Sequence, residues 1–178
     1  MINLRHLLLS AALVLSATAA EPPRPSPPLE ILRPGAPTVT LSQFRGKIVV
    51  LALIHTTCSH CQQFTVVLNI LAHEYSRRGV QFLECAFNED AVPTLPEFQA
   101  RFHPSFPIGY NSPAAINTYL RRTILDRRPL YVPHLVVLDR AGRIHADIPG
   151  EDAFFRTAEN SLSALLDGML KPAAGRKK

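Results

Sequence analysis

The chain has 178 residues, of which 47% are hydrophobic and 19% charged, a composition that can fill the core of one globular domain. Its formal net charge of +5 is modest, and part of that charge sits at the two chain ends. The arginine pairs at 121–122 and 127–128 have few aromatic neighbours, a pattern that argues against a nucleic-acid-binding protein.

The first 20 residues have the pattern of an export signal. Arg5 precedes an apolar run over residues 7–15, and the small residues at 16–20 suit cleavage after Ala19 or Ala20. The apolar stretch is shorter than the roughly 20 residues that a membrane-spanning helix needs, which favours cleavage over a retained anchor. We therefore expect an exported, periplasmic protein whose signal peptide covers residues 1–20.

Prolines dominate the segment that follows this signal, at positions 22, 23, 25, 27, 28, 34 and 37. Each proline fixes φ and removes an amide donor, so the segment is expected to stay extended rather than to join a packed structure. These residues predict a tether over 21–38, a folded domain over 39–171 and a basic, disordered tail over 172–178.

The predicted elements of the domain begin with a short, continuously apolar run at 48–54, typical of a strand buried on both faces. Apolar residues at helical spacing then extend to Gly79, a natural helix terminator, and a second strand is predicted at 80–87. This strand, helix, strand order implies a right-handed parallel crossover.

The second half of the domain alternates shorter elements. The sequence predicts helices near 95–102 and over 113–125, with a short extended segment at 106–110 between them. An antiparallel hairpin is predicted from the runs at 135–138 and 143–148, and an amphipathic helix over 152–170 closes the domain.

The candidate chemistry lies in Cys58-Ser59-His60-Cys61, where the 48–54 strand gives way to a helix. A sulfur at a helix N-terminus meets unpaired amides and the positive end of the helix dipole, which stabilise a thiolate. Cys58 is then the expected nucleophile, and Cys61, one turn further and facing inward, the resolving thiol. An imidazolium at His60 would favour the reduced pair, and so the oxidation of partners.

The remaining cysteine gives little support to a metal site. A structural zinc ion needs about four ligands, and the chain has three cysteines with no second closely spaced pair. Cys85 lies in the middle of the predicted 80–87 strand, where a buried and inert side chain is expected.

Three segments resemble exported TlpA/ResA-like proteins of the redoxin (AhpC/TSA-like) superfamily: residues 41–47, the 58–61 motif, and Val132-Pro133 with the run at 135–142. The resemblance implies a thioredoxin-like α/β fold, a central mixed sheet flanked by helices with a helical insertion before a cis-proline loop. It also implies a thiol-disulfide oxidoreductase, a monomer without a cofactor, that exchanges with protein thiols or disulfides, including those of a membrane or periplasmic redox partner.

The same resemblance implies the substrate contacts. Pro133 is expected to be cis and to lie opposite the cysteine pair, and the backbone of Val132 is expected to bind the substrate peptide. Thr57 occupies the place of the tryptophan that the family usually has before its first cysteine, and it is the third expected contact.

A second departure from the resemblance concerns proton transfer. Many thioredoxins bury an acidic residue on the central strand to move protons for the inner cysteine, whereas residues 48–54 contain none. Glu84, Glu89, His55 or water must then take that role, or else reduction by this protein is expected to be slow.

Two other activities stay open. A peroxidase of the peroxiredoxin type would have a Pro-x-x-x-Thr/Ser-x-x-Cys pattern, but Leu51 and His55 stand at its Pro and Thr positions. A Sco-like copper chaperone would bind copper through two cysteines and a histidine, here His134, His103 or His55, although Sco cysteines have three residues between them rather than two. The direction of electron flow is also open, because TlpA/ResA-like proteins are typically reductants.

Overall fold

The computed structural model describes residues 23–171. The predicted signal at 1–20 and the predicted tail at 172–178 lie outside the described residues.

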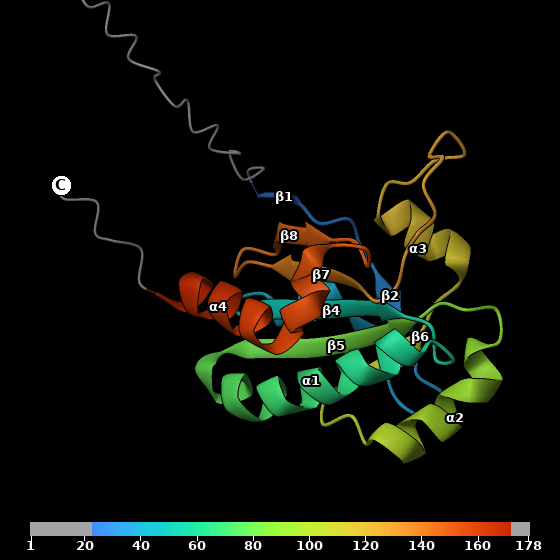
Figure 1. Ribbon diagram of the computed structural model, residues 1–178, viewed down its shortest axis with the longest axis horizontal. Helices are drawn as coiled ribbons and strands as arrows, with labels where there is room; N and C mark the ends of the chain where they lie inside the picture. The colour runs from blue at the N-terminus through green and yellow to red at the C-terminus, as the bar shows by residue number, and fades with distance from the viewer. Residues whose placement is uncertain (1–22, 172–178) are drawn as a thin grey trace, which may run out of the picture.

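A six-stranded mixed sheet in the order β1-β8-β7-β4-β5-β6 forms the centre of the molecule (Figure 1). The strands β4, β5 and β6 run parallel, and β7, β8 and β1 continue the sheet on the other side of β4 in antiparallel pairs. The sheet strands are β1 Arg24–Pro25, β4 Ile48–Ile54, β5 Val80–Ala86, β6 Ile108–Tyr110, β7 His134–Leu138 and β8 Arg143–Ile148. The prediction of a central mixed sheet with a 135–148 hairpin is confirmed.

Helices cover both faces of this sheet, as Figure 1 shows for α1 and α2 on one side and α3 on the other. The α-helices are α1 Ser59–Tyr75, α2 Ala91–Phe102, α3 Pro113–Tyr119 and α4 Ala158–Leu170, and the short 3-10 helices are η1 Leu41–Phe44, η2 Ser76–Arg78 and η3 Ala153–Thr157. The helices α2 and α3 form the insertion expected between the crossover and the cis-proline loop.

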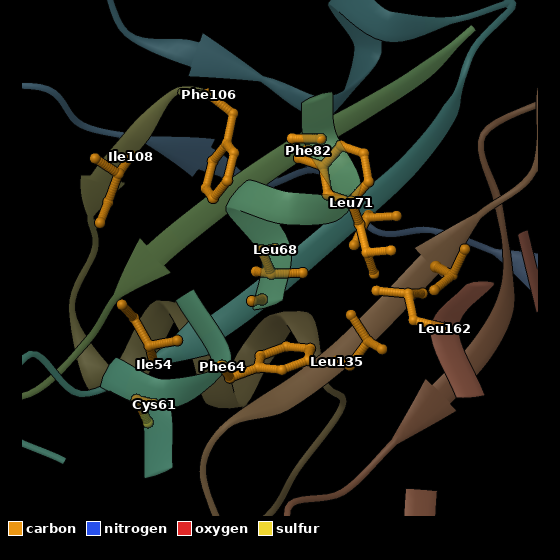
Figure 2. Close-up of a cluster of buried hydrophobic side chains, with 14 of the residues drawn as sticks. Ile54, Cys61, Phe64, Leu68, Leu71, Phe82, Phe106, Ile108, Leu135 and Leu162 are labelled. Carbon is orange, nitrogen blue, oxygen red and sulfur yellow. The ribbon is translucent and has the colours of Figure 1, made fainter. Parts of the chain in front are cut away.

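The two covered faces explain why every residue of β4 is apolar and buried. Successive side chains of a strand point to opposite faces. Val50 and Ala52 join the core under α1, α2 and α4, part of which Figure 2 shows, whereas Leu51 and Leu53 join the core under α3 and the N-terminal segment.

The helix predicted over 113–125 ends earlier than expected. Helix α3 stops at Tyr119, and Arg121 then takes a left-handed conformation with φ of 56°. Ile124, which lies within the predicted helix, is instead fully exposed in the loop that follows α3. Residues 120–131 form a loop that leads to β7.

The segment predicted to be a tether is part of the domain, so the prediction for 21–38 is wrong where the structure describes it. Strand β1 pairs with β8, and a second small sheet joins β2 (Glu30–Ile31) to β3 (Val39–Thr40). Leu29 and Ile31 are 5% and 0% exposed. Because β1 is an edge strand, a proline at position 25, which has no backbone N–H, is tolerated there without loss of a hydrogen bond between interior strands.

A substitution in this segment tests its place in the core. Ile31→Ala is expected to lower the free energy of unfolding by about 2–5 kcal/mol, because it leaves a cavity among fully buried residues. The exposed neighbour provides a matched control, since Glu30→Ala should change stability by less than about 0.5 kcal/mol. Urea denaturation measures both, and equal small effects would restore the tether interpretation.

Candidate active site

Strand β4 and helix α1 position the two cysteines. Cys58 is the N-cap of α1, with extended backbone, and its Sγ accepts a hydrogen bond of 3.4 Å from the Cys61 amide. Cys58 is half-buried, whereas Cys61 is 0% exposed and lies with Ile54 and Phe64 at one end of the core cluster (Figure 2). Both are free thiols. One sulfur is therefore accessible at the helix N-terminus, and the other is enclosed.

The loop before β7 brings a second segment to the accessible sulfur. The Val132–Pro133 peptide bond is cis, as the family resemblance implied. The carbonyl oxygen of Val132 lies 4.0 Å from Cys58 Sγ, and Pro133 is buried. The cysteine motif and the cis-proline loop, which are far apart in the sequence, thus meet at the N-terminus of α1.

A groove of about 750 Å³ borders the two segments. Its lining includes His60 of α1, Val132 and Pro133 of the cis-proline loop, and Phe155 and Arg156 of η3. His60 is exposed at the groove, in reach of whatever occupies it. The contribution of η3 was not predicted, because the sequence pattern indicated a single amphipathic helix over 152–170, whereas the structure has η3 before α4.

Thr57 does not join His60, Val132 and Pro133 in this groove. It is exposed, and it lines a separate hollow of about 100 Å³ with residues of α2, including Thr94 and Phe98. The structure therefore brings two of the three predicted substrate contacts together in the groove and places the third in a separate hollow.

A buried acid lies on β5, the strand next to β4. Glu84 of β5 pairs in register with Ala52 of β4 and is fully buried. Its Oε1 lies 2.8 Å from the Thr65 hydroxyl, which lies 3.0 Å from the Cys61 carbonyl oxygen. Within residues 23–171, Oε2 of Glu84 has no hydrogen-bond partner. Of the proposed carboxylates, Glu89 is exposed, so Glu84 alone is buried near the inner cysteine.

Burial controls the protonation of both groups. Loss of solvent raises the pKa of Glu84 to about 8, although the Thr65 hydroxyl opposes part of the shift. Burial also raises the pKa of Cys61 well above its ordinary range, and the neighbouring Cys58 and Glu84 charges add to the effect while a backbone hydrogen bond at His55 opposes it. Cys61 therefore stays a thiol until a nearby base accepts its proton.

The raised pKa of Glu84 predicts a pH-dependent stability. The folded state binds a proton at this carboxyl up to about pH 8, whereas the unfolded chain releases it near pH 4.5, so the contribution of Glu84 is lost as pH rises between these values. Relative to the parent, Glu84→Gln should gain on the order of 5 kcal/mol of unfolding free energy between pH 4 and pH 9. Urea denaturation at both pH values measures the gain, and Glu89→Gln should show none.

Cys85 lies on the other face of the sheet from the cysteine pair. Its side chain belongs to the core under α3, it is 0% exposed, and burial raises its pKa to about 12. The interpretation of Cys85 as a buried residue is confirmed.

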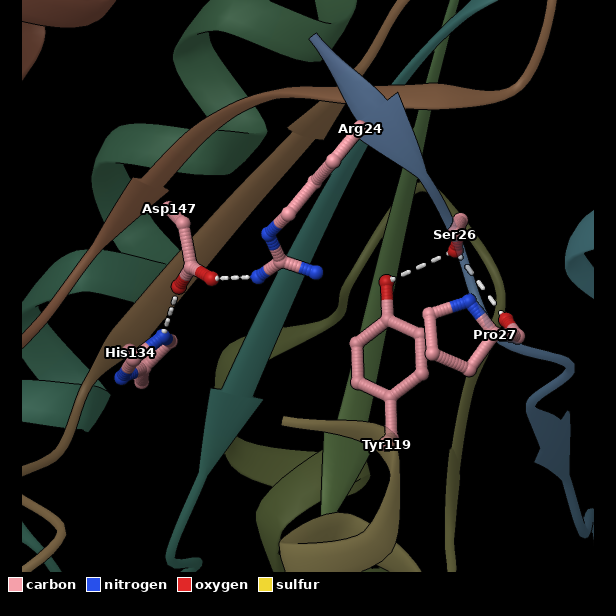
Figure 3. A network of polar contacts seen from close by, with 6 residues as sticks. All are labelled: Arg24, Ser26, Pro27, Tyr119, His134 and Asp147. Atoms are coloured by element: carbon pink, nitrogen blue, oxygen red, sulfur yellow. Dashed lines mark hydrogen bonds and ion pairs between the residues drawn. The ribbon is translucent and has the colours of Figure 1, made fainter. Parts of the chain in front are cut away.

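The residues named for the two alternative activities have other surroundings within the described part of the chain. Leu51, at the proline position of the peroxidase pattern, is fully buried, and His55, at the threonine position, packs edge-on against Phe87 with ring centroids 4.5 Å apart. Nε2 of His134 lies 2.6 Å from Asp147, which also pairs with Arg24 (Figure 3). Among the described residues, no group of three or more His, Cys, Asp or Glu side chains could hold a metal ion.

A mixed sheet flanked by helices, with an accessible and an enclosed cysteine beside a cis-proline loop, defines the class of thioredoxin-fold proteins of the thiol-disulfide oxidoreductase type. The sequence profile of the Redoxin family matches residues 25–162, and the chain belongs to this family.

Solved structures share the fold at low sequence identity. A Chlorobium tepidum protein assigned as thiol:disulfide interchange protein DsbE aligns with a TM-score of 0.71 and 16% identity over 86% of this chain and 100% of its own. A thiol:disulfide interchange protein of the thioredoxin family from Chlorobium tepidum TLS gives 0.69 and 18% over 86% and 100%. The thioredoxin domain of a Bacteroides vulgatus thiol-disulfide oxidoreductase gives 0.64 and 15% over 82% and 95%.

No curated protein matches the sequence. In the region from 23 to 171, no helix is both long and apolar enough to cross a membrane.

Proposed function

We propose that this protein is an exported thiol-disulfide oxidoreductase that exchanges disulfides with partner proteins through Cys58 and Cys61. The observation that supports it best is the unequal placement of the two sulfurs. Cys58 caps α1, half-buried and within 4.0 Å of the Val132 carbonyl oxygen, while Cys61 is fully enclosed one turn further. Export is proposed from the N-terminal sequence pattern.

The exchange runs through a mixed disulfide. The Cys58 thiolate attacks one sulfur of the partner's disulfide, a bond forms between Cys58 and the partner, and the partner's other sulfur leaves as a thiolate. Cys61 then loses its proton and attacks Cys58, which releases the partner's second thiolate and leaves the Cys58–Cys61 disulfide. The partner gains two electrons and the pair loses two, and oxidation of a partner dithiol is the same sequence in reverse.

The proton of Cys61 is proposed to move to and from Glu84. A buried thiol cannot exchange its proton directly with bulk water, and Glu84 is the enclosed carboxyl whose charge is coupled to it. With its pKa at about 8, Glu84 is mostly protonated at neutral pH and can protonate the Cys61 sulfur as it leaves a disulfide. This is the proton transfer that oxidation of a partner requires.

The partner polypeptide is proposed to lie in the 750 Å³ groove beside the cis-proline loop. Its cysteine reaches Cys58, and its flanking residues contact the Val132 backbone, Pro133 and the imidazole of His60. An exposed imidazolium at the groove would stabilise the Cys58 thiolate, which favours the oxidising direction. Proteins of the same compartment, periplasmic or membrane-bound, are the expected partners.

Equilibration with glutathione tests the proposal. The Cys58–Cys61 disulfide is expected to form reversibly, with a reduction potential less negative than the about −270 mV typical of thioredoxin. The protein should also accelerate the reduction of insulin by dithiothreitol. Failure to form this disulfide at any glutathione ratio would refute the function, whereas a more negative potential would reverse only the proposed direction.

A further inference from the structure

The loop between α3 and β7, residues 120–131, carries an unusual tip. It extends from the body of the molecule beyond α3 (Figure 1). The Asp126 amide donates to the Thr123 carbonyl oxygen at 3.1 Å, and the Thr123 amide donates to the Asp126 carboxylate. These bonds close a tight turn, with Ile124 and Leu125 at its two central positions. Such positions are normally polar or glycine.

Both central side chains project into solvent. Ile124 is 102% exposed and Leu125 82%, whereas the next most exposed large apolar side chain among the described residues, Ile70, is 52%. A fixed turn that holds two apolar side chains entirely outside the core gains nothing from packing. Apolar side chains exposed together mark contact sites.

The charges around the tip have one sign. Arg121 and Arg122 precede the turn and Arg127 and Arg128 follow it, against a single acidic residue, Asp126. None of the four arginines makes an ion pair within residues 23–171. The Arg122 guanidinium donates to the Arg128 carbonyl oxygen, which ties together the two sides of the loop. The apolar tip is therefore bordered on both sides by free positive charge.

We propose that this loop docks the protein on the surface of an anionic phospholipid membrane. Ile124 and Leu125 enter the boundary between headgroups and acyl chains, and the flanking guanidiniums bind the lipid phosphates. A bilayer surface has phosphates in its outer headgroup layer and acyl chains beneath them, which matches flanking arginines with an apolar tip that extends beyond them. A folded acidic protein would instead need a pocket to receive a protruding Ile-Leu tip. Tyr131, 48% exposed where the loop returns to the domain, is of a residue type favoured at membrane interfaces.

This inference goes beyond disulfide exchange and does not depend on it. The loop continues directly into Val132 and Pro133, so docking would hold the exchange site beside the membrane. The redox assays above do not use lipid, so failure of either proposal is seen separately.

Vesicle sedimentation gives the first test. The full chain should bind vesicles of phosphatidylcholine with 30% phosphatidylglycerol at least about tenfold more tightly than pure phosphatidylcholine vesicles. Ile124→Ser with Leu125→Ser should weaken that binding about tenfold or more, and so should Arg127→Gln with Arg128→Gln. Arg77→Gln with Lys47→Gln removes two exposed charges elsewhere and should have little effect. Because all variants share the same termini, any binding by the chain ends is common to them.

The absence of tryptophan from the chain allows a local test of insertion. Leu125→Trp should show a blue-shifted emission and quenching by brominated lipid when anionic vesicles are added. Val92→Trp, at a 47% exposed position on α2, should show neither.

Three results would overturn the proposal. The first is an unchanged emission of the residue 125 tryptophan with anionic vesicles. The second is binding that survives the double serine substitution while depending on the arginines, which would indicate a purely electrostatic contact. The third is tip-dependent binding to polyglutamate but not to vesicles, which would identify an acidic polypeptide as the partner.

Discussion

Replacing Cys58 by alanine is expected to reduce disulfide exchange to the background rate, whereas replacing Cys61 by alanine should trap partners as stable mixed disulfides. The two outcomes differ because the two sulfurs differ in access. Cys58 caps α1 at the surface beside the groove, and Cys61 is fully buried one turn further. Without Cys61 the attack on the partner still occurs, but no sulfur is left to release it.

Trapping in an extract of the native compartment measures this difference. Covalent complexes should appear with Cys61→Ala, disappear on adding dithiothreitol, and be absent with Cys58→Ala. Cys85→Ala is the matched control, because it removes a cysteine from the opposite face of the sheet and should leave exchange unchanged. If Cys61→Ala captured nothing while the parent protein exchanged normally, the assignment of roles would be wrong.

Glu84→Gln is expected to slow exchange about 100-fold near pH 7, a loss typical of removing a general acid or base. Glutamine keeps the shape and the contact with Thr65, but it cannot take up or give a proton. The step affected is the one in which Cys61 gains or loses its proton. When the reduced protein is mixed with a disulfide partner, release of the mixed disulfide should therefore slow while its formation does not.

Stopped-flow kinetics over pH 6–9 separate this role from a structural one. The release rate of the parent should change through about pH 8, where Glu84 titrates, and that inflection should be missing from the variant. Glu89→Gln, which alters an exposed carboxylate close by in the sequence, should keep both rate and inflection. Equal release rates in Glu84→Gln and the parent would mean that His55 or water moves the proton.

The elements that the sequence predicted correctly are those marked by a pattern within one short stretch of residues. A seven-residue apolar run identified β4, helical spacing identified α1, and the turn at 139–142 identified the hairpin of β7 and β8. The N-terminal segment was misread because the number of prolines outweighed Leu29 and Ile31, which pack in a core cluster whose other members, such as Leu83 and Ile116, lie far along the chain. The early end of α3 depends on the left-handed backbone of Arg121, which no residue type there demands.

The residues of the candidate site also fall into those that a sequence motif marks and those that only the fold brings together. Its cysteines and Pro133 stand in recognisable motifs, so the sequence located them. Phe155 and Arg156 line the groove with residues of α1 that lie about 90 positions earlier in the chain. No local spacing in the sequence could indicate that contact. Glu84 was one of several candidates, because every neighbour on β5 from residue 82 to 86 is buried and the alternation that would show its face is missing.

The sheet itself acts as a partition between thiols. Cys85 and Cys61 contribute to the two different cores on its two sides, so they cannot meet while β4 and β5 stay paired. An oxidising environment can therefore close only one intramolecular ring in the native protein, and scrambled isomers require the strands to separate. The rate at which Cys85 is alkylated would then report the rate at which the whole domain opens.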